Sequence, residues 1–262
     1  MNGQLPEGVK VGRFRRADSV FIGLVSGDEV VEVRTASMLD LVDGGIIEKE
    51  RKHSLTELRV LPPVDRPSKI ICIGLNYRSH IREMEWETPK TPIIFSKPSS
   101  SIIGPEDEIV LPPTSSRVDY EGESAIVIGR RAHHVRNGSS CILGYTCLND
   151  VTARDLQKID PDWTRAKGFD TFAPIGPFLT GSCPRRLVTR LNGKTVQDAS
   201  LTDRVFDDKA LVEYVSSVMT LEPGDVIATG TPSGISEMRA GDSVEVELDT
   251  VGVLRNKVVK SP

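Results

Sequence analysis

The alternation of apolar and polar residues predicts a chain built mainly from short strands. SVEVEL (243–248) places Val244, Val246 and Leu248 on one face and two glutamates on the other, which is typical of a half-buried strand. With VLRNKVV (253–259) it predicts a C-terminal hairpin. Residues 9–33 predict two or three short strands around a turn at SGDE, and short helices are expected near 37–43 and 54–58.

Further apolar runs extend this pattern along the chain. They predict strands at 69–74, 92–95, 108–111, 123–131 and 141–150, and a strand at DVIATG (225–230). DKALVEYVSSVM (208–219) has Leu211, Val212, Val215 and Val218 at helical spacing, which predicts an amphipathic helix. Many short strands, few helices and no repeated βαβ unit favour a mixed β-rich α+β fold with a rolled or folded sheet. The proline-rich segment LPPVDRPSK (61–69) suggests a small β-rich N-terminal domain (1–66) before a larger domain (67–262).

One predicted strand departs from the usual pattern. In DYEGESAIVIGRR (119–131), Glu121 and Glu123 point to the same face as Ala125 and Val127, and the apolar run after them indicates a strand covered on both sides. Two carboxylates there lose hydration and repel each other, so something positive must compensate them. An arginine or lysine is the ordinary partner, and a divalent cation is the alternative that carries chemistry.

Composition narrows the possible functions. The chain has 262 residues and a net charge of -4, so it has no basic field to attract nucleic acid. No apolar run is long enough to cross a membrane, and the N-terminal sequence has no apolar segment typical of a secretion signal. The four cysteines form no CxxC motif. We therefore expect a cytoplasmic protein without nucleic-acid or membrane partners.

A third carboxylate follows the strand at 141–150. Asp150 stands where an apolar run ends, so its spacing alone is typical of a helix N-cap as well as of a metal ligand. In the helix predicted after it, Arg154 and Gln157 are three residues apart and share a face. Ion pairing and solvent exposure are the ordinary explanations for these two side chains.

Three other segments contain candidate chemistry. His80 and Glu83 share a face if LNYRSHIREMEW (75–86) is helical, and a histidine held by a glutamate can activate water, although a charged exposed helix has the same pattern. Lys167 lies among Gly168, Phe169, Phe172, Pro174 and Pro177, a rigid apolar environment in which a lysine can stabilise an oxyanion. The glycine-rich turn IATGTPSG (227–234) can offer Thr231 and backbone N–H groups to an anionic ligand.

Taken together and in order, these segments resemble the fumarylacetoacetate hydrolase family. The resemblance covers roughly residues 68–258 and rests on GLNYRSHIREM, IIFSKPSSSIIGP, VDYEGESAIVIGRRA, GYTCLNDVTARDLQ, WTRAKGFDTFAPIGPF and LEPGDVIATGTPSG. It implies a β-roll or folded-sheet catalytic domain, and the N-terminal stretch is similar to the small β domain of many microbial members. It also implies a homodimer.

The resemblance assigns a role to each candidate residue. It implies that Glu121, Glu123 and Asp150 hold one Mg²⁺ or Mn²⁺ ion per subunit. It implies that Lys167 is the active-site lysine, and that Arg154, Gln157 and Thr231 contact the substrate. His80 and Glu83 match a water-activating pair on a lid, with an H-x-x-E-M pattern that looks like acylpyruvate hydrolases and oxaloacetate decarboxylases of the family. We expect the lid, residues 75–90, to be mobile when the site is empty.

The implied substrate is a small 2-oxo acid, but the reaction stays open at this point. A C–C hydrolase would cleave a 2,4-dioxo acid of the acylpyruvate or fumarylpyruvate type through a metal-stabilised pyruvate enolate. An oxaloacetate decarboxylase or a 2-hydroxyhepta-2,4-diene-1,7-dioate isomerase would use the same enolate, and a noncatalytic metal-binding protein would need only the carboxylates. The pair His80 and Glu83 favours the hydrolase. The run DASLTDRVFDD (198–208) departs from the pattern of most members and leaves the substrate's tail undetermined.

Overall fold

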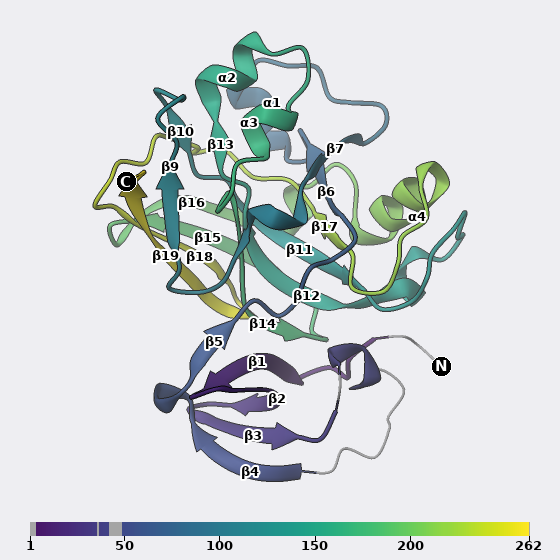
Figure 1. Cartoon of the computed structure of the whole chain (residues 1–262). Coiled ribbons are helices and arrows are strands. Elements are labelled where there is room, and N and C mark those ends of the chain that lie inside the picture. The colour runs from purple at the N-terminus through teal and green to yellow at the C-terminus, as the bar shows by residue number, and fades with distance from the viewer. Residues whose placement is uncertain (1–3, 36, 42–48, 262) are drawn as a thin grey trace.

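The N-terminal part of the chain is a small antiparallel sheet. The structure is a computed structural model that describes residues 4–35, 37–41 and 49–261. The sheet, at the bottom of Figure 1, consists of β1 (Lys10–Arg16), β2 (Ser19–Ser26), β3 (Glu29–Val33) and β4 (Lys49–Ser54). The strands and the turn predicted between 9 and 33 are confirmed. The expected helices near 37–43 and 54–58 are short 3-10 turns, η1 (Met38–Leu41) and η2 (Leu55–Glu57), and residues 42 and 43 lie outside the described residues.

Strand β14 (Ala173–Thr180) joins this small sheet to the rest of the molecule. It pairs antiparallel with β1 through Lys10–Thr180 and Val11–Leu179. The apolar pattern does not predict β14, because its two prolines and a glycine are unusual in a strand. The pairing of β14 with β12 shifts register between Tyr145 and Cys147, and this irregularity accommodates the prolines and the glycine of β14. The division of the chain after residue 66 stays a prediction.

The described strands form one long sheet, a five-stranded sheet and one short pair. After β14 the long sheet continues in the order β12 (Ile142–Asn149), β11 (Gly122–Ile128), β17 (Val226–Ala228), β6 (Ile70–Gly74) and β7 (Ile93–Lys97), while β5 (Arg59–Leu61) pairs with β1 and β8 (Ile102–Ile103) with β14. The second sheet has the order β16 (Lys194–Ser200), β15 (Arg186–Leu191), β18 (Ser243–Leu248), β19 (Gly252–Lys260) and β9 (Glu108–Leu111), and β10 (Val118–Asp119) pairs with β13 (Thr152–Ala153).

The second sheet contains one predicted hairpin and one that the sequence analysis did not predict. The C-terminal hairpin β18–β19 is confirmed. The hairpin β15–β16 turns at Asn192 and Gly193, which both have positive φ. Asn-Gly between two strands is a strong hairpin signal, so this element was predictable from the sequence.

The helices are few, as the pattern predicted, and they are also short. They are α1 (Arg78–Glu83), α2 (Arg154–Ile159), α3 (Thr164–Lys167) and α4 (Asp208–Val218), with 3-10 turns η3 (Ser99–Ser101), η4 (Gly138–Cys141) and η5 (Leu201–Asp203). Helices α1, α2 and α3 gather at the top of Figure 1. The amphipathic helix α4 is confirmed: it buries Leu211, Val212 and Val215, whereas Val218 in its last turn is 54% exposed. No helix among the described residues is long and apolar enough to cross a membrane.

Strand β11 is covered on both faces, as expected for the run after Glu123. Ala125 and Val127 pack in one apolar cluster, and Ile126 and Ile128 pack in another that includes residues of α4. In β18, by contrast, the valines and Leu248 are buried while the two glutamates are partly exposed. The strand-rich composition with few helices confirms a mixed β-rich α+β fold.

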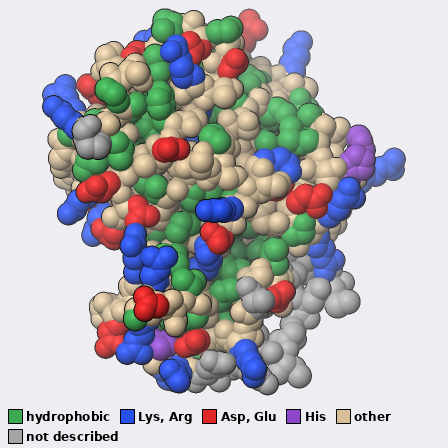
Figure 2. Space-filling view, viewed as in Figure 1, with side chains coloured by type: hydrophobic (Ala, Val, Ile, Leu, Met, Phe, Trp, Pro, Cys, Tyr) green, Lys and Arg blue, Asp and Glu red, His purple; other side chains and the backbone are tan. Residues whose placement is uncertain are grey.

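Charged side chains of both signs are mixed on the molecular surface. Figure 2 shows Lys and Arg interspersed with Asp and Glu, and with apolar patches, over the face in view. No large field of one sign covers this face, which agrees with the net charge of -4.

Candidate metal centre and active site

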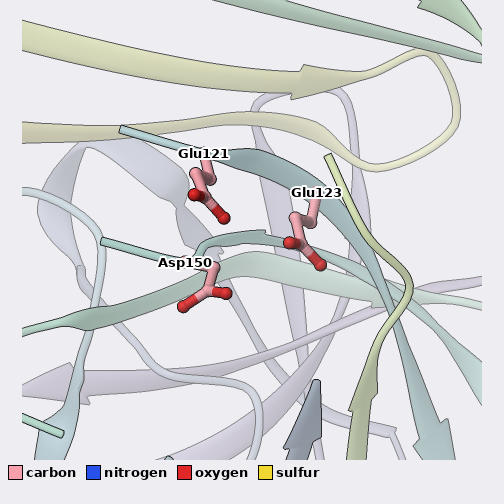
Figure 3. Close-up of side chains that lie close together, drawn as sticks. All are labelled: Glu121, Glu123 and Asp150. Carbon is pink, nitrogen blue, oxygen red and sulfur yellow. The ribbon is translucent and has the colours of Figure 1, made fainter. Parts of the chain in front are cut away.

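Three carboxylates come together where β11 begins and β12 ends. Glu121 lies just before β11, Glu123 lies in it, and Asp150 follows β12, whose antiparallel register sets Glu123 beside Leu148. One oxygen from each carboxylate lies within 4.8 Å of the others, and all three side chains are buried. Figure 3 shows the carboxylates facing a common space. Asp150 does not cap α2, because the N-cap position of that helix is Ala153.

Two buried lysines neutralise part of this charge. Lys167 Nζ, at the end of α3, lies 2.8 Å from Glu121 Oε2 and 2.6 Å from Asp150 Oδ2. Lys97 Nζ, at the end of β7, donates to Asp150 Oδ1 at 2.6 Å and to the Val151 carbonyl at 3.0 Å. The ordinary explanation of the Glu-x-Glu pair, a basic partner, therefore holds for Glu121.

Arg154 completes the positive side of the site. Its guanidinium donates to Glu121 Oε1, to Asp119 Oδ2 at 2.9 Å and to Gln157 Oε1 at 2.5 Å. Asp119 is fully buried and also accepts from Arg117, so it fixes the plane of the Arg154 guanidinium. The predicted shared face of Arg154 and Gln157 is confirmed.

The pKa values of Glu121 and Glu123 are shifted in opposite directions. Burial raises the pKa of Glu121, but the charges of Lys167 and Arg154 outweigh burial and hold that pKa below its usual range. Burial likewise lowers the pKa of Lys167, but Asp150 and Glu121 outweigh it, so the ammonium pKa is raised and the group stays charged. Burial, Asp150 and Glu121 together raise the pKa of Glu123 well above its usual value.

Glu123 is the carboxylate that the protein compensates least. It makes no ion pair with a described lysine, arginine or histidine, and it accepts one backbone hydrogen bond, from Gly230 N at 2.7 Å. A buried carboxylate in this state needs a proton or a cation. Three convergent carboxylate oxygens suit Mg²⁺ or Mn²⁺, which prefer oxygen ligands, so these residues fit the metal that the resemblance implies.

His80 and Glu83 lie on α1, beside the carboxylate cluster. His80 is buried, and its Nδ1 lies 3.0 Å from Glu83 Oε2. The other oxygen of Glu83 accepts a hydrogen bond from Gly234 N at 2.9 Å, so the carboxylate connects the helix to the glycine-rich loop. The predicted shared face of the two side chains is confirmed.

The glycine-rich loop differs from the sequence expectation. Thr231 is buried in the site, but its hydroxyl donates to the Gly122 carbonyl at 2.9 Å and accepts from Gln197 Nε2 at 2.9 Å. The amides of Gly230 and Gly234 bind Glu123 and Glu83. The expectation that this loop offers N–H groups to an anionic ligand is therefore wrong for these two amides, because they hold the site's own carboxylates.

The three carboxylates, Lys167, Arg154, His80 and Thr231 line one cavity of about 320 Å³. The cavity brings together all the sequence-predicted site residues except Glu83, which contacts the cavity's His80. Its other lining residues are mostly apolar and include Ile73, Gly74, Leu75, Met84, Trp86, Phe95, Lys158 and Trp163.

Sequence reasoning missed two charged residues that support the site. Lys97 belongs to IIFSKPSSSIIGP, and Asp119 is two residues before Glu121. The sequence contains a signal for each residue. Lys97 ends an apolar run, and Asp119 extends the Glu-x-Glu spacing by one more step on the same face. Both side chains are almost completely buried, so each needs the partners that it has here.

Comparisons with known proteins identify the family of this chain. Residues 69–259 match the family described as fumarylacetoacetate (FAA) hydrolase C-terminal. The oxaloacetate tautomerase Fahd2a of Rattus norvegicus is 43% identical over 220 residues, which cover 78% of this chain and 70% of that protein. The solved 2-hydroxyhepta-2,4-diene-1,7-dioate isomerase of Mycobacterium marinum is 38% identical, with a TM-score of 0.86 over 97% of this chain and 99% of that one.

A third relative was solved with ligands. The maleylpyruvate hydrolase of Sphingobium sp. SYK-6, in complex with manganese(II) and pyruvate, is 29% identical, with a TM-score of 0.79 over 95% of this chain and 100% of that one. The names of these relatives span a tautomerase, an isomerase and a hydrolase, so the likeness fixes the family rather than the reaction. On the match to nearly three quarters of its length and on the shared fold, the chain belongs to the fumarylacetoacetate hydrolase family.

Proposed function

We propose that this protein is a Mg²⁺- or Mn²⁺-dependent enzyme that hydrolyses a C–C bond of 2,4-dioxo acids of the acylpyruvate or fumarylpyruvate type. The observation that carries the proposal is the presence of two groups in one cavity. One is the buried carboxylate cluster, and the other is His80 held by Glu83. The first supplies ligands for a cation, and the second supplies a base for water.

Glu121, Glu123 and Asp150 would hold the cation. Bound there, it would polarise the 2-oxo group of the substrate and stabilise negative charge on that oxygen. The maleylpyruvate hydrolase relative supports this assignment, because it was solved with manganese(II) and with pyruvate, which is a 2-oxo acid.

The basic residues bind and orient the substrate. Lys167 is held as a charged ammonium by Glu121 and Asp150, so it adds a fixed positive charge where negative charge develops. Arg154 and Gln157 line the cavity on one face of α2, where they contact the substrate and set its orientation. Thr231 fixes the wall of the site through Gly122 and presents its remaining lone pair.

His80 activates the water that cleaves the bond. Because the Glu83 carboxylate can only accept, His80 Nδ1 carries the hydrogen and Nε2 is left as a base. Nε2 takes a proton from water, and the oxygen attacks the C4 carbonyl carbon. The C3–C4 bond then breaks, its electron pair passes to the pyruvate portion, and C3 takes up a proton. The products are pyruvate and the carboxylic acid of the tail.

Keto–enol tautomerisation of oxaloacetate is the second candidate function. The relative named oxaloacetate tautomerase, at 43% identity, is the observation that favours it. The same residues serve this reaction if His80 moves a proton at C3 in place of activating water. The remaining alternative is a noncatalytic metal-binding protein. Such a protein would catalyse neither reaction, and it would need no histidine held by a glutamate.

A Mg²⁺-supplemented assay of the wild type and His80→Ala tests the proposal. We expect the wild type to convert acetylpyruvate to pyruvate and acetate. In His80→Ala we expect kcat to fall about 10²- to 10⁴-fold, because the general base is lost. Calorimetry should show unchanged Mn²⁺ affinity, because His80 is not a metal ligand in this assignment. The exposed His133 supplies a control, since His133→Ala should keep full activity.

Two results would contradict the proposal, the first its reaction and the second the role of His80. If acetylpyruvate is not cleaved while the enol of oxaloacetate is converted rapidly, the tautomerase is the correct function. If acetylpyruvate is cleaved equally fast by wild type and His80→Ala, the histidine is not the base.

A further inference from the structure

The cavity has an aromatic wall that begins at the catalytic lysine. Lys167 Nζ lies 5.0 Å from the centre of the Phe95 ring. The Trp163 ring packs against Phe95 edge to face, with 5.0 Å between ring centres. Both rings line the cavity, Phe95 from β7 and Trp163 from the residue that precedes α3.

Gly74 allows the Trp163 indole to lie against the backbone. A Cβ atom on Gly74 would lie 3.0 Å and 3.2 Å from ring carbons Cζ3 and Cη2 of Trp163. These distances are shorter than ordinary contacts, so the indole lies directly against the backbone at the end of β6. The aromatic wall is therefore a packed part of the fold.

The segment that follows α1 contributes further apolar side chains. Met84 and Trp86 line the same cavity, and the Trp86 amide donates to the Ile81 carbonyl at 3.1 Å. The Trp86 side chain is 52% exposed. An exposed indole contributes little to folding, and at the edge of a cavity it is available to a ligand.

Charge is distributed unevenly through the cavity. Its buried end contains the carboxylates, His80, Arg154 and Lys167, and these side chains are already paired with one another or with the backbone. Towards the exposed end the only charged lining residue among those described is Lys158, whose side chain is exposed. An exposed lysine binds a carboxylate weakly, because water and salt screen the pair.

We propose that the apolar wall of this cavity is a subsite for an apolar aryl or alkyl tail. It consists of Phe95, Trp163, Met84 and Trp86. The inference rests on the proposed function, in which the 2-oxo acid occupies the buried end. Within the proposed substrate class, acylpyruvates with an apolar acyl group are then preferred over the fumarylpyruvate type, because the second carboxylate of fumarylpyruvate would lose water against indole and phenyl rings.

Binding of three 2-oxo acids that cannot be cleaved tests the subsite separately from catalysis. Pyruvate has no tail, 4-phenyl-2-oxobutanoate has an aryl tail, and 2-oxoglutarate has a carboxylate tail. Titration calorimetry on the Mg²⁺-loaded protein should show the aryl acid binding about tenfold to a hundredfold tighter than 2-oxoglutarate, the amount expected for burying one phenyl ring.

Variants assign the preference to the wall. Trp163→Ala and Trp86→Ala should each reduce the aryl preference by about tenfold, the cost of losing one aromatic contact and its buried area. Pyruvate affinity should stay within about twofold, since pyruvate has no tail that would lie against these two indoles. The exposed Trp86 can be replaced without disturbing the core. Ile159→Ala is the control, because Ile159 is 71% exposed and does not line the cavity.

The outcomes separate the two proposals. If pyruvate binds in a Mg²⁺-dependent way but the aryl acid gains nothing over 2-oxoglutarate, the apolar subsite is wrong. Tighter binding of 2-oxoglutarate that is lost in Lys158→Ala would replace it with a carboxylate subsite. If no 2-oxo acid binds with Mg²⁺, the proposed function itself is overturned, and the subsite with it.

Discussion

At the scale of single residues, the chemistry of this protein centres on Glu123. Glu121 and Asp150 each have a lysine within 2.8 Å, whereas Glu123 has one backbone N–H and two carboxylates as neighbours. Its charge is therefore unfavourable in the metal-free protein and favourable once a cation binds. The same side chain thus couples stability to metal binding.

Glu123→Gln tests this coupling. The amide removes a repulsive charge, so we expect the metal-free variant to melt at a higher temperature than the metal-free wild type. We also expect Mn²⁺ affinity to fall by about 100-fold or more, because a charged ligand is lost and even outer-sphere partners contribute 10- to 100-fold. Calorimetric titration with Mn²⁺ and thermal melts measure both effects.

The protein contains a matched control for that substitution. Glu245 is the first member of the other Glu-x-Glu pair, on the exposed face of β18, where it pairs with Arg255. Glu245→Gln should leave Mn²⁺ affinity unchanged. If Glu123→Gln also binds Mn²⁺ like the wild type, Glu123 is not a ligand.

At the scale of elements, α1 is held by residues of the segment 198–208. Asp203 Oδ2 accepts a hydrogen bond from Ser79 N at 3.0 Å, and Arg78 Nη1 donates to the carbonyls of Asp203 and Arg204 at 3.1 Å and 2.8 Å. At its other end, Glu83 accepts from Gly234. A helix of six residues is not stable by itself, so these contacts determine where His80 lies. That residues 75–90 are mobile without ligand stays a prediction.

Asp203→Ala should loosen this helix. Ser79 N loses its acceptor, so we expect faster amide hydrogen exchange in residues 78–84 and a lower kcat on acetylpyruvate, while Mn²⁺ affinity is unchanged. Asp203→Asn keeps an acceptor oxygen and should restore most of the protection. Exchange in Asp203→Ala that equals the wild type would show that Arg78 and Glu83 fix α1 without Asp203.

At the scale of the whole molecule, the candidate metal site joins elements far apart in the sequence. The carboxylates lie at the start of β11 and just after β12, and the residues that hold them come from β7, α2, α3 and the loop after β17. A cation bound here stabilises the whole native state, since the unfolded chain has no such site. A homodimer, which the family resemblance implies, stays a proposal that sedimentation would check.

Saturating Mg²⁺ should therefore raise the melting temperature, by about 5 °C or more at 100 times its Kd. The rise should grow with pH. The pKa of Glu123 is raised, so the metal-free protein is most stable when that group is protonated, and it loses stability as pH increases through the folded-state pKa. Mg²⁺ binding requires the ionised form of Glu123, so bound Mg²⁺ removes this loss of stability. Melts between pH 5 and 8 with Mg²⁺ or EDTA measure the difference, and a constant difference would contradict the argument.

The sequence by itself determined many of the local elements, and it determined the family. The period of apolar residues predicted α4 and the β18–β19 hairpin, because burial of one face leaves its spacing in the sequence. Glu121 and Glu123 were recognisable as unusual because the strand after them is apolar on both faces. The ordered series of motifs then identified the family and the third carboxylate, Asp150.

Only the tertiary structure decided how the charges are paired. Lys97 and Asp150 are 53 residues apart, and Gly230 and Glu123 are 107 apart, so sheet register and loop packing bring them together. Strand β14 forms despite its prolines because β1 and β12 pair with it on either side. Likewise Trp163 lies against Gly74 because β6 and the segment before α3 meet there. Spacing in a sequence reports neighbours along the chain, whereas these contacts are properties of the folded surfaces.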